Sequence, residues 1–96
     1  MNVPSLSKKE QRILQLLISN GEMYGLEMVK ADSALKRGTI YVTLGRMADK
    51  GYVESRQVKE EGRPGLPKRV FRASALGARV YDAWQIAHAA IKEAYA

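Results

Sequence analysis

Apolar side chains recur at helical spacing near the start of the chain and predict a first helix. Ser7 can cap this helix with its hydroxyl while Glu10 reaches back to the backbone, which makes a Ser-x-x-Glu capping box. Asn20 and Gly21 provide the stop signal. The apolar residues that form the core-facing stripe of this helix are Ile13, Leu14, Leu17 and Ile18.

A second helical pattern covers residues 23–31, and a short connector, residues 32–35, separates it from a third pattern over residues 36–50. Gly25 lies near the start of the second helix, where the missing side chain lets another helix approach closely. Two helices joined by a brief polar turn, the second of them basic, are typical of a helix-turn-helix. The core-facing residues of the second helix are expected to be Leu26, Met28 and Val29.

The 36–50 helix, which Gly51 stops, divides into two faces. At about 100° per residue, one face carries the apolar side chains of Ile40, Leu44, Met47 and Ala48. The outer face carries Thr39, Val42 and Arg46, with Thr43 at its boundary. Hydroxyl, methyl and guanidinium groups together suit contacts to base edges in a DNA major groove. From this pattern alone, an ordinary surface helix remains the alternative.

After Gly51 the pattern changes to one that predicts strands. Residues 52–58 and 68–73 have an extended, partly alternating character, and a segment dense in glycine and proline separates them. We expect a β-hairpin with a long tip that carries Arg63, Lys68 and Arg69. A hairpin after a helix-turn-helix is a wing, and a basic wing lies along the phosphate backbone or in the minor groove. The alternative is a charged, solvated hairpin.

The last helix begins after Ser74 and continues toward the C-terminus. Its apolar stripe is longer and wider than one small winged core can cover, and its alanines let two helices approach closely. We therefore expect a homodimer whose interface contains Leu76, Val80, Ala83, Trp84, Ala87 and Ile91. Trp84 has two interpretations: an anchor of the dimer interface, or an aromatic wall that contacts a small, flat aromatic effector. Tyr81, His88 and Tyr95 are expected to flank one edge of this stripe.

The net charge of +6 lies entirely in the middle of the chain. Residues 34–72 hold ten basic and four acidic residues, whereas the remainder holds six of each. A basic patch confined to one part of a small domain is the electrostatic footprint of a polyanion binder. This distribution favours DNA contact by the 36–50 helix over the surface-helix alternative.

Composition excludes several other classes of protein. The chain has no cysteine and one histidine, His88, so neither a thiolate site nor a histidine-based metal site is expected, and no cofactor is predicted. No apolar run approaches the ~20 residues that cross a bilayer, so we expect a soluble cytoplasmic protein without membrane contact. No nucleophile–base–acid grouping or phosphate-cradling glycine loop is present, so an enzyme is not expected.

Several short motifs, in order and at suitable spacing over residues 23–77, resemble the PadR-type transcriptional regulators, the phenolic-acid decarboxylase repressor family. The motifs are Met-Tyr-Gly-Leu-Glu-Met at 23–28, Gly-Thr-Ile-Tyr at 38–41, Leu-Gly-Arg-Met at 44–47, Lys-Gly-Tyr-Val-Glu-Ser at 50–55, Gly-Arg-Pro at 62–64 and Phe-Arg-Ala-Ser-Ala-Leu-Gly at 71–77. The chain departs from the family pattern in four places. Arg37 stands where proline is common, and Gly65-Leu66-Pro67 lengthens the wing tip. Val70-Phe71 replaces an aromatic pair, and the C-terminal part is a single short helix.

The resemblance implies a winged helix-turn-helix homodimer that binds an inverted-repeat operator, usually as a repressor. It implies that Thr39 and Tyr41 lie where the recognition helix opens, and that Arg63 lies beside the DNA backbone. A family-type ligand pocket is less expected, because the single C-terminal helix offers few residues to build one.

Together these observations predict a mostly α fold with a small β-hairpin. Residues 1–73 form a winged helix-turn-helix and residues 74–96 a C-terminal dimerisation helix, within one compact domain. The expected function is sequence-specific binding of double-stranded DNA by a transcriptional regulator; the rival is a winged-helix interaction module whose basic face binds an acidic protein. Base contacts are expected from Thr39, Val42, Thr43 and Arg46, and backbone contacts from Lys36, Arg37, Tyr41, Arg63, Lys68 and Arg69.

Overall fold

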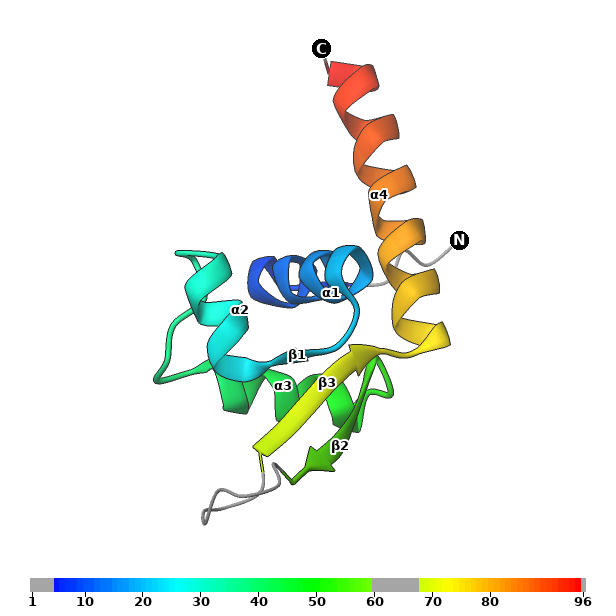
Figure 1. Ribbon diagram of the computed structural model, residues 1–96. Helices are drawn as coiled ribbons and strands as arrows, with labels where there is room; N and C mark the ends of the chain where they lie inside the picture. Colours follow the sequence, from blue (N-terminus) through cyan, green and yellow to red (C-terminus); the bar gives the residue numbers. More distant parts are fainter. Residues whose placement is uncertain (1–4, 60–67, 96) are drawn as a thin grey trace.

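A computed structural model describes residues 5–59 and 68–95 and shows four helices with a three-stranded sheet (Figure 1). The sheet order is β1-β3-β2, with both pairs antiparallel. The elements in chain order are α1 (Lys8–Asn20), β1 (Met23–Tyr24), α2 (Gly25–Ala31), α3 (Ile40–Asp49), β2 (Val53–Val58), β3 (Lys68–Ala73) and α4 (Ala75–Tyr95). This is the predicted winged helix-turn-helix followed by a C-terminal helix.

The first helix begins and ends as predicted. The Ser7 hydroxyl accepts a hydrogen bond from the Glu10 amide at 3.1 Å, and the Ser7 amide donates to the Glu10 carboxylate at 3.0 Å, which completes the capping box. Gly21 follows the helix with φ of +79°, a conformation that glycine adopts without strain. Ile13, Leu14 and Leu17 are buried, but Ile18 is 44% exposed and does not belong to the core.

The second predicted helix is shorter than its pattern suggested, because its first two residues form a strand. Met23 and Tyr24 pair with Phe71 and Val70 of β3, a partner that local periodicity cannot reveal. Within α2, Met28 is fully buried and Val29 is half-buried. Leu26 is 38% exposed, so the expectation that it faces the core was wrong.

The third helix begins at Ile40, four residues later than predicted. Leu35 is buried in the core, and the chain after it makes a separate turn in which the Ile40 amide donates to the Lys36 carbonyl at 2.9 Å. Thr39 occupies the N-cap position. Ile40, Leu44 and Met47 are buried as expected, whereas Ala48 is exposed.

The hairpin pairs β2 with β3 from Val53 opposite Ala73 to Val58 opposite Lys68, which confirms the predicted strands. Of the residues predicted to lie on the tip, Arg63 is outside the described residues, whereas Lys68 and Arg69 belong to β3. The core lies between the sheet and the helices, since α1 packs against α3, β3 and α4 while α2 packs against α3. Its members are Ile13, Leu14, Leu17, Met23, Met28, Leu35, Ile40, Leu44, Met47, Val53, Phe71 and Tyr81.

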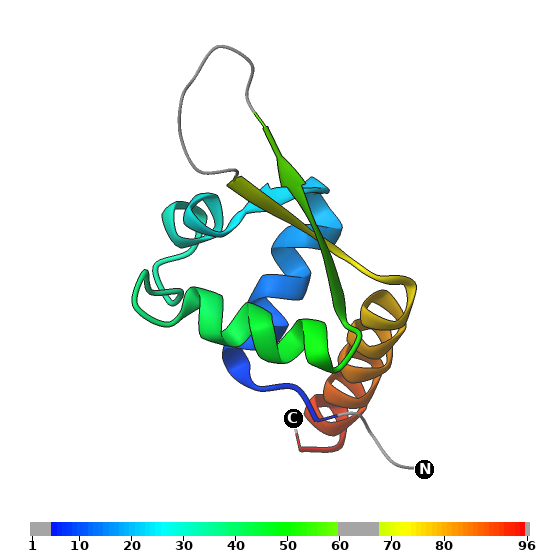
Figure 2. The ribbon, with the colours of Figure 1, turned by 90° about the horizontal axis from the view of Figure 1, so that it is seen from below.

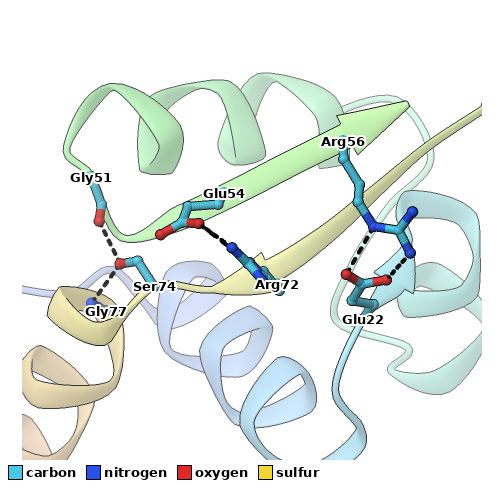
Figure 3. A network of polar contacts seen from close by, with 7 residues as sticks. All are labelled: Glu22, Gly51, Glu54, Arg56, Arg72, Ser74 and Gly77. Carbon is cyan, nitrogen blue, oxygen red and sulfur yellow. Dashed lines mark hydrogen bonds and ion pairs between the residues drawn. The ribbon is translucent and has the colours of Figure 1, made fainter. Parts of the chain in front are cut away.

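One polar junction connects the end of α3 to the start of α4 (Figure 3). The Ser74 hydroxyl donates to the Gly51 carbonyl and accepts from the Gly77 amide at 2.9 Å, so Ser74 caps α4 as predicted. The Ser74 amide donates to the Tyr52 carbonyl at 3.0 Å. Gly77 lies so close to Tyr52 that a Cβ at this position would be 2.0 Å from the Tyr52 carbonyl oxygen. The junction therefore fixes the direction in which α4 leaves the domain.

The C-terminal part of α4 projects away from the rest of the molecule, as Figure 1 shows. Val80 and Tyr81 are buried within the protomer, so Tyr81 belongs to the core rather than to the flank where it was expected. Ile86 is 72% exposed and Ile91 is 55% exposed. Across the described parts of the chain, no helix combines the length and hydropathy that a membrane span requires.

Candidate nucleic-acid interface

The α3 outer face, defined as Thr39, Val42, Thr43 and Arg46, is accessible to a partner. Val42 is 56% exposed, Thr39 and Arg46 are exposed, and Thr43 is half-buried. The opposite side of α3 is anchored by buried Ile40, Leu44 and Met47. The helix is thus held by one side and presents polar and methyl groups on the other, as the sequence predicted.

The two threonines of this face use their hydroxyls differently. The Thr43 hydroxyl donates to the Thr39 carbonyl at 3.1 Å, so its hydrogen is used within the helix. The Thr39 side chain makes no capping hydrogen bond, although Thr39 stands at the N-cap. Instead, the Thr39 hydroxyl oxygen accepts from the Lys9 ammonium at 3.3 Å. Thr43 therefore offers a partner an acceptor oxygen and a methyl group, while Thr39 can still donate its hydroxyl hydrogen to a partner.

A groove of about 450 Å³ runs between α3 and the first turn of α1, which lie side by side in Figure 2. It brings the whole α3 outer face together with residues of α1 that sequence reasoning did not select. The only available signal was the pair of lysines at the start of α1, and the balanced charge of the rest of the chain hid it. The lining residues are Ser7, Lys8, Lys9, Glu10, Thr39, Val42, Thr43, Arg46 and Lys50.

The acidic member of this groove is paired with a base. Glu10 is 6% exposed and accepts a hydrogen bond from the Lys50 ammonium at 2.8 Å. Burial raises the pKa of the Glu10 carboxyl, but hydrogen bonds from Lys50 and Ser7 outweigh it and hold this pKa below its ordinary value. Glu10 is therefore ionised at neutral pH, and the charge of Lys50 is neutralised by this ion pair.

Other bases of the 34–72 segment are also paired with acids (Figure 3). Arg56 donates to both carboxylate oxygens of Glu22, at 2.6 and 3.0 Å. Arg72 donates to Glu54 at 2.7 Å. In contrast, within the described residues no acidic side chain lies within ion-pair distance of Lys36, Arg37 or Arg46. The positive charge available to a partner is thus more concentrated around α3 than the sequence count implied.

A second groove, of about 610 Å³, lies between α2, α3 and β3. It brings together Tyr41, Lys68 and Arg69, three of the residues predicted to contact phosphates. Tyr41 is 53% exposed and packs over Gly25, where an added Cβ would lie 2.8 Å from the Tyr41 ring, so the predicted close approach at Gly25 is confirmed. The other lining residues are Tyr24, Leu26, Glu27, Lys30 and Phe71.

The remaining predicted backbone contacts are distributed around these grooves. Lys36 and Arg37 are exposed in the turn before α3. The Lys68 ammonium lies 5.6 Å from the centre of the Tyr24 ring, and Arg69 donates to the Ser55 hydroxyl at 3.0 Å.

The predicted dimer interface lies on α4, apart from both grooves. Leu76 is 48% exposed and Ile91 is 55% exposed, whereas Val80 is 7% exposed and has little surface left for a partner. Trp84 stacks on Tyr81 of the same helix, with ring centres 6.4 Å apart, and its ring centre lies 3.8 Å from that of His88, whose ring is tilted. Ala83, Trp84 and Ala87 are half-buried. Among the described side chains, no group of three or more potential metal ligands occurs.

Comparison with known proteins places this geometry in a family. The model of the transcriptional regulator PadR-like family matches residues 13–83. A search of curated proteins gives no match.

Solved structures show the same fold. The chain is 21% identical to Bacillus subtilis PadR in complex with operator DNA, with a TM-score of 0.75 over 85% of this chain and 49% of that one, so it spans about half of that protein's length. A PadR family transcription regulator from Clostridium difficile is 23% identical, with a TM-score of 0.77 over 92% and 94% of the two chains. The PcaV regulator of Streptomyces coelicolor, in complex with its natural ligand, is 17% identical, with a TM-score of 0.77 over 94% and 60%.

Proposed function

Since the chain belongs to the PadR-like family of transcriptional regulators, we propose that it is a cytoplasmic repressor that binds an inverted-repeat operator as a homodimer. The observation that carries the proposal is the α3 outer face. It is exposed, it is anchored from behind, and within the described residues its arginine has no acidic partner. An ordinary surface helix is not expected to combine these features beside a groove lined by lysines. Bacillus subtilis PadR, which shares the fold, was solved with operator DNA.

The α3 outer face supplies the base contacts in this proposal. Arg46 donates to guanine O6 and N7, a bidentate contact that contributes about 1–3 kcal/mol of discrimination. Val42 packs against a thymine methyl. Thr43, whose hydroxyl hydrogen is used within the helix, offers an oxygen to a base amino group and its own methyl to thymine.

Phosphate contacts position the protein on the duplex. Tyr41, Lys68 and Arg69 share the second groove, so one stretch of sugar-phosphate backbone can meet all three. Lys36 and Arg37 precede α3 and contact the backbone at the opening of that helix. Arg63 is assigned to the same role from its place in the Gly-Arg-Pro motif.

The homodimer forms through α4 in this proposal. Leu76 and Ile91 expose large apolar surfaces that a second copy of the helix would cover, with Ala83 and Ala87 between them. Two copies of α3 then lie about 34 Å apart, which matches one turn of DNA. Trp84 anchors the interface; its alternative role, contact with a flat aromatic effector, predicts that planar aromatic compounds quench tryptophan fluorescence of the dimer.

The test is a selection of bound duplexes from random DNA, followed by affinity measurements on the selected operator and its single-base variants. Arg46→Ala should relax the preference at one base pair of each half-site. Arg69→Ala should weaken all duplexes alike, and Arg79→Ala, an exposed arginine outside both grooves, should change neither. Failure of the selection to enrich any sequence, or identical profiles for Arg46→Ala and Arg69→Ala, would refute the proposed roles. Stronger binding to an acidic protein than to duplex DNA at low salt would favour the interaction-module alternative.

A further inference from the structure

Lys9 belongs to α1, yet its ammonium group lies at the N-terminal end of α3. Its nitrogen is 3.3 Å from the Thr39 hydroxyl oxygen, across a sequence separation of 30 residues. The side chain is half-buried in the groove between the two helices. Lys9 is thus held next to the α3 outer face by the packing of α1 against α3.

This contact determines how the Thr39 hydroxyl is used. A hydroxyl has one hydrogen and two lone pairs, and here one lone pair accepts from Lys9. Among the described residues the Thr39 hydroxyl donates no hydrogen bond, so its hydrogen remains available to a partner. The adjacent ammonium charge also disfavours the approach of a second donor. Lys9 and Thr39 therefore present two donors, N–H and O–H, side by side.

We propose that Lys9 is a specificity-determining residue, which together with Thr39 selects a guanine in the operator half-site. This inference rests on the proposed function. In the major groove guanine presents two adjacent acceptors, N7 and O6, whereas adenine presents N7 beside an amino donor and cytosine presents an amino donor. A pair of neighbouring donors satisfies both acceptors of guanine but leaves one donor facing the amino group of adenine. The Lys9–Thr39 pair is distinct from Arg46, which lies two turns further along α3.

The competing source of the same chemistry is a phosphate oxygen, which also accepts from an ammonium group. Lys8 provides the matched control, because it stands in the same turn of α1 and lines the same groove, while no hydrogen bond joins its side chain to Thr39. A lysine that contacts only phosphate contributes to every duplex equally and to the slope of affinity against salt.

The experiment measures affinity for the selected operator and its single-base variants with wild-type protein, Lys9→Met, Lys8→Met, Thr39→Val and the double variant Lys9→Met/Thr39→Val. Methionine keeps the length of the lysine side chain and removes its donors. Thermal unfolding at one protein concentration checks that each variant is folded. Thr39→Val identifies the base pair concerned as the one where the preference for guanine falls.

We expect Lys9→Met to lower the preference for guanine at that base pair by about fivefold or more, the low end of a specific base contact. The double variant should lose less preference than the two single losses added together, since each donor orients the other toward the same guanine. Lys8→Met should leave the preference unchanged. The proposal is overturned if Lys9→Met weakens all duplexes by one factor and lowers the salt slope by about one, as a phosphate contact does, or if it binds as the wild type does. A wild-type protein that selects no duplex overturns the proposed function itself.

Discussion

The junction between α3 and α4 predicts that the same substitution, glycine to alanine, has opposite effects at two positions. At Gly77 an added Cβ would lie 2.0 Å from the Tyr52 carbonyl oxygen, 2.9 Å from the Tyr52 carbonyl carbon and 3.2 Å from a Leu14 methyl. Two of these three neighbours are backbone atoms. At Gly45, in the middle of α3, an added Cβ would meet nothing within 4 Å.

The cost at Gly77 follows from what must move. The Tyr52 carbonyl must retreat by at least about 1 Å. It also accepts the Ser74 amide at 3.0 Å, so that hydrogen bond stretches. Overpacking costs about 1–3 kcal/mol and a weakened hydrogen bond about 1 kcal/mol, so we expect a loss near 3 kcal/mol. Gly45→Ala should instead stabilise the protein by about 0.5–1 kcal/mol through helix propensity.

Thermal unfolding at one fixed protein concentration measures both effects. In a domain of this size 1 kcal/mol corresponds to about 4–8 °C, so Gly77→Ala should lower the midpoint by roughly 12–24 °C and Gly45→Ala should raise it by roughly 2–8 °C. Because the junction sets the direction of α4, Gly77→Ala should also weaken operator binding below its unfolding temperature. A Gly77→Ala protein as stable as the wild type would refute the argument, since the clash is with backbone rather than with a movable side chain.

Three further predictions concern charge and assembly. The pKa of Glu10 is lower in the folded protein than its ordinary value of 4.5, so its pairing with Lys50 stabilises the fold above that pH and the contribution is lost as pH falls through the folded value. Urea titrations of wild type and Lys50→Met should therefore differ at pH 7 and draw together as pH falls below 4.5. In sedimentation analysis Ile91→Glu should convert the proposed dimer to a monomer, whereas Ile86→Glu, about 200° around α4 from Trp84, should not. Dissociation by Ile86→Glu alone would place the interface on the other face. Finally, for a dimer that contacts about eight phosphates, a plot of log affinity against log salt concentration should have a slope of about −7. A slope near zero would exclude electrostatic DNA binding.

The sequence predicted those parts of the fold whose signals are local. The Ser7–Glu10 capping box, the glycine stops at Gly21 and Gly51, and the Ser74 cap involve residues within a few positions of one another. The extended character of residues 52–58 and 68–73 and the apolar period of α1 are equally local. Such elements form from short-range chemistry, so a single sequence contains the information that they need.

Other features depended on partners distant in sequence. Met23 and Tyr24 continue a helical pattern, and only pairing with β3 makes them a strand. Burial of Leu35 moves the start of α3 to Ile40. Tyr81 is drawn into the core because α4 packs against α1 and β3 near its start. Each of these outcomes reflects tertiary contact overriding a local periodicity that was correctly identified.

The two faces of α3 were predictable because helical phase decides them, but the charge around α3 was not. Counting charges along the chain treats Lys50, Arg56 and Arg72 as available to a polyanion, although the fold pairs them with Glu10, Glu22 and Glu54. Two of these three acids, Glu10 and Glu22, come from outside the basic segment. A sum over a segment therefore cannot distinguish a base that stabilises the fold from one that can bind DNA.

At the start of α1 a charge count errs in the opposite sense. Lys8 and Lys9 lie in a part of the chain whose charges balance, so a segment count assigns them no role. Glu10 is the acid nearest to these two lysines in sequence. In the folded protein it is buried and paired with Lys50, so it does not form an ion pair with Lys8 or Lys9. The Glu10–Lys50 pair thus has a functional consequence as well as a structural one: it leaves Lys9 free to meet Thr39. For this reason Lys50→Met should lower the preference for guanine at the base pair that Thr39 is proposed to contact, even at temperatures where the variant remains folded.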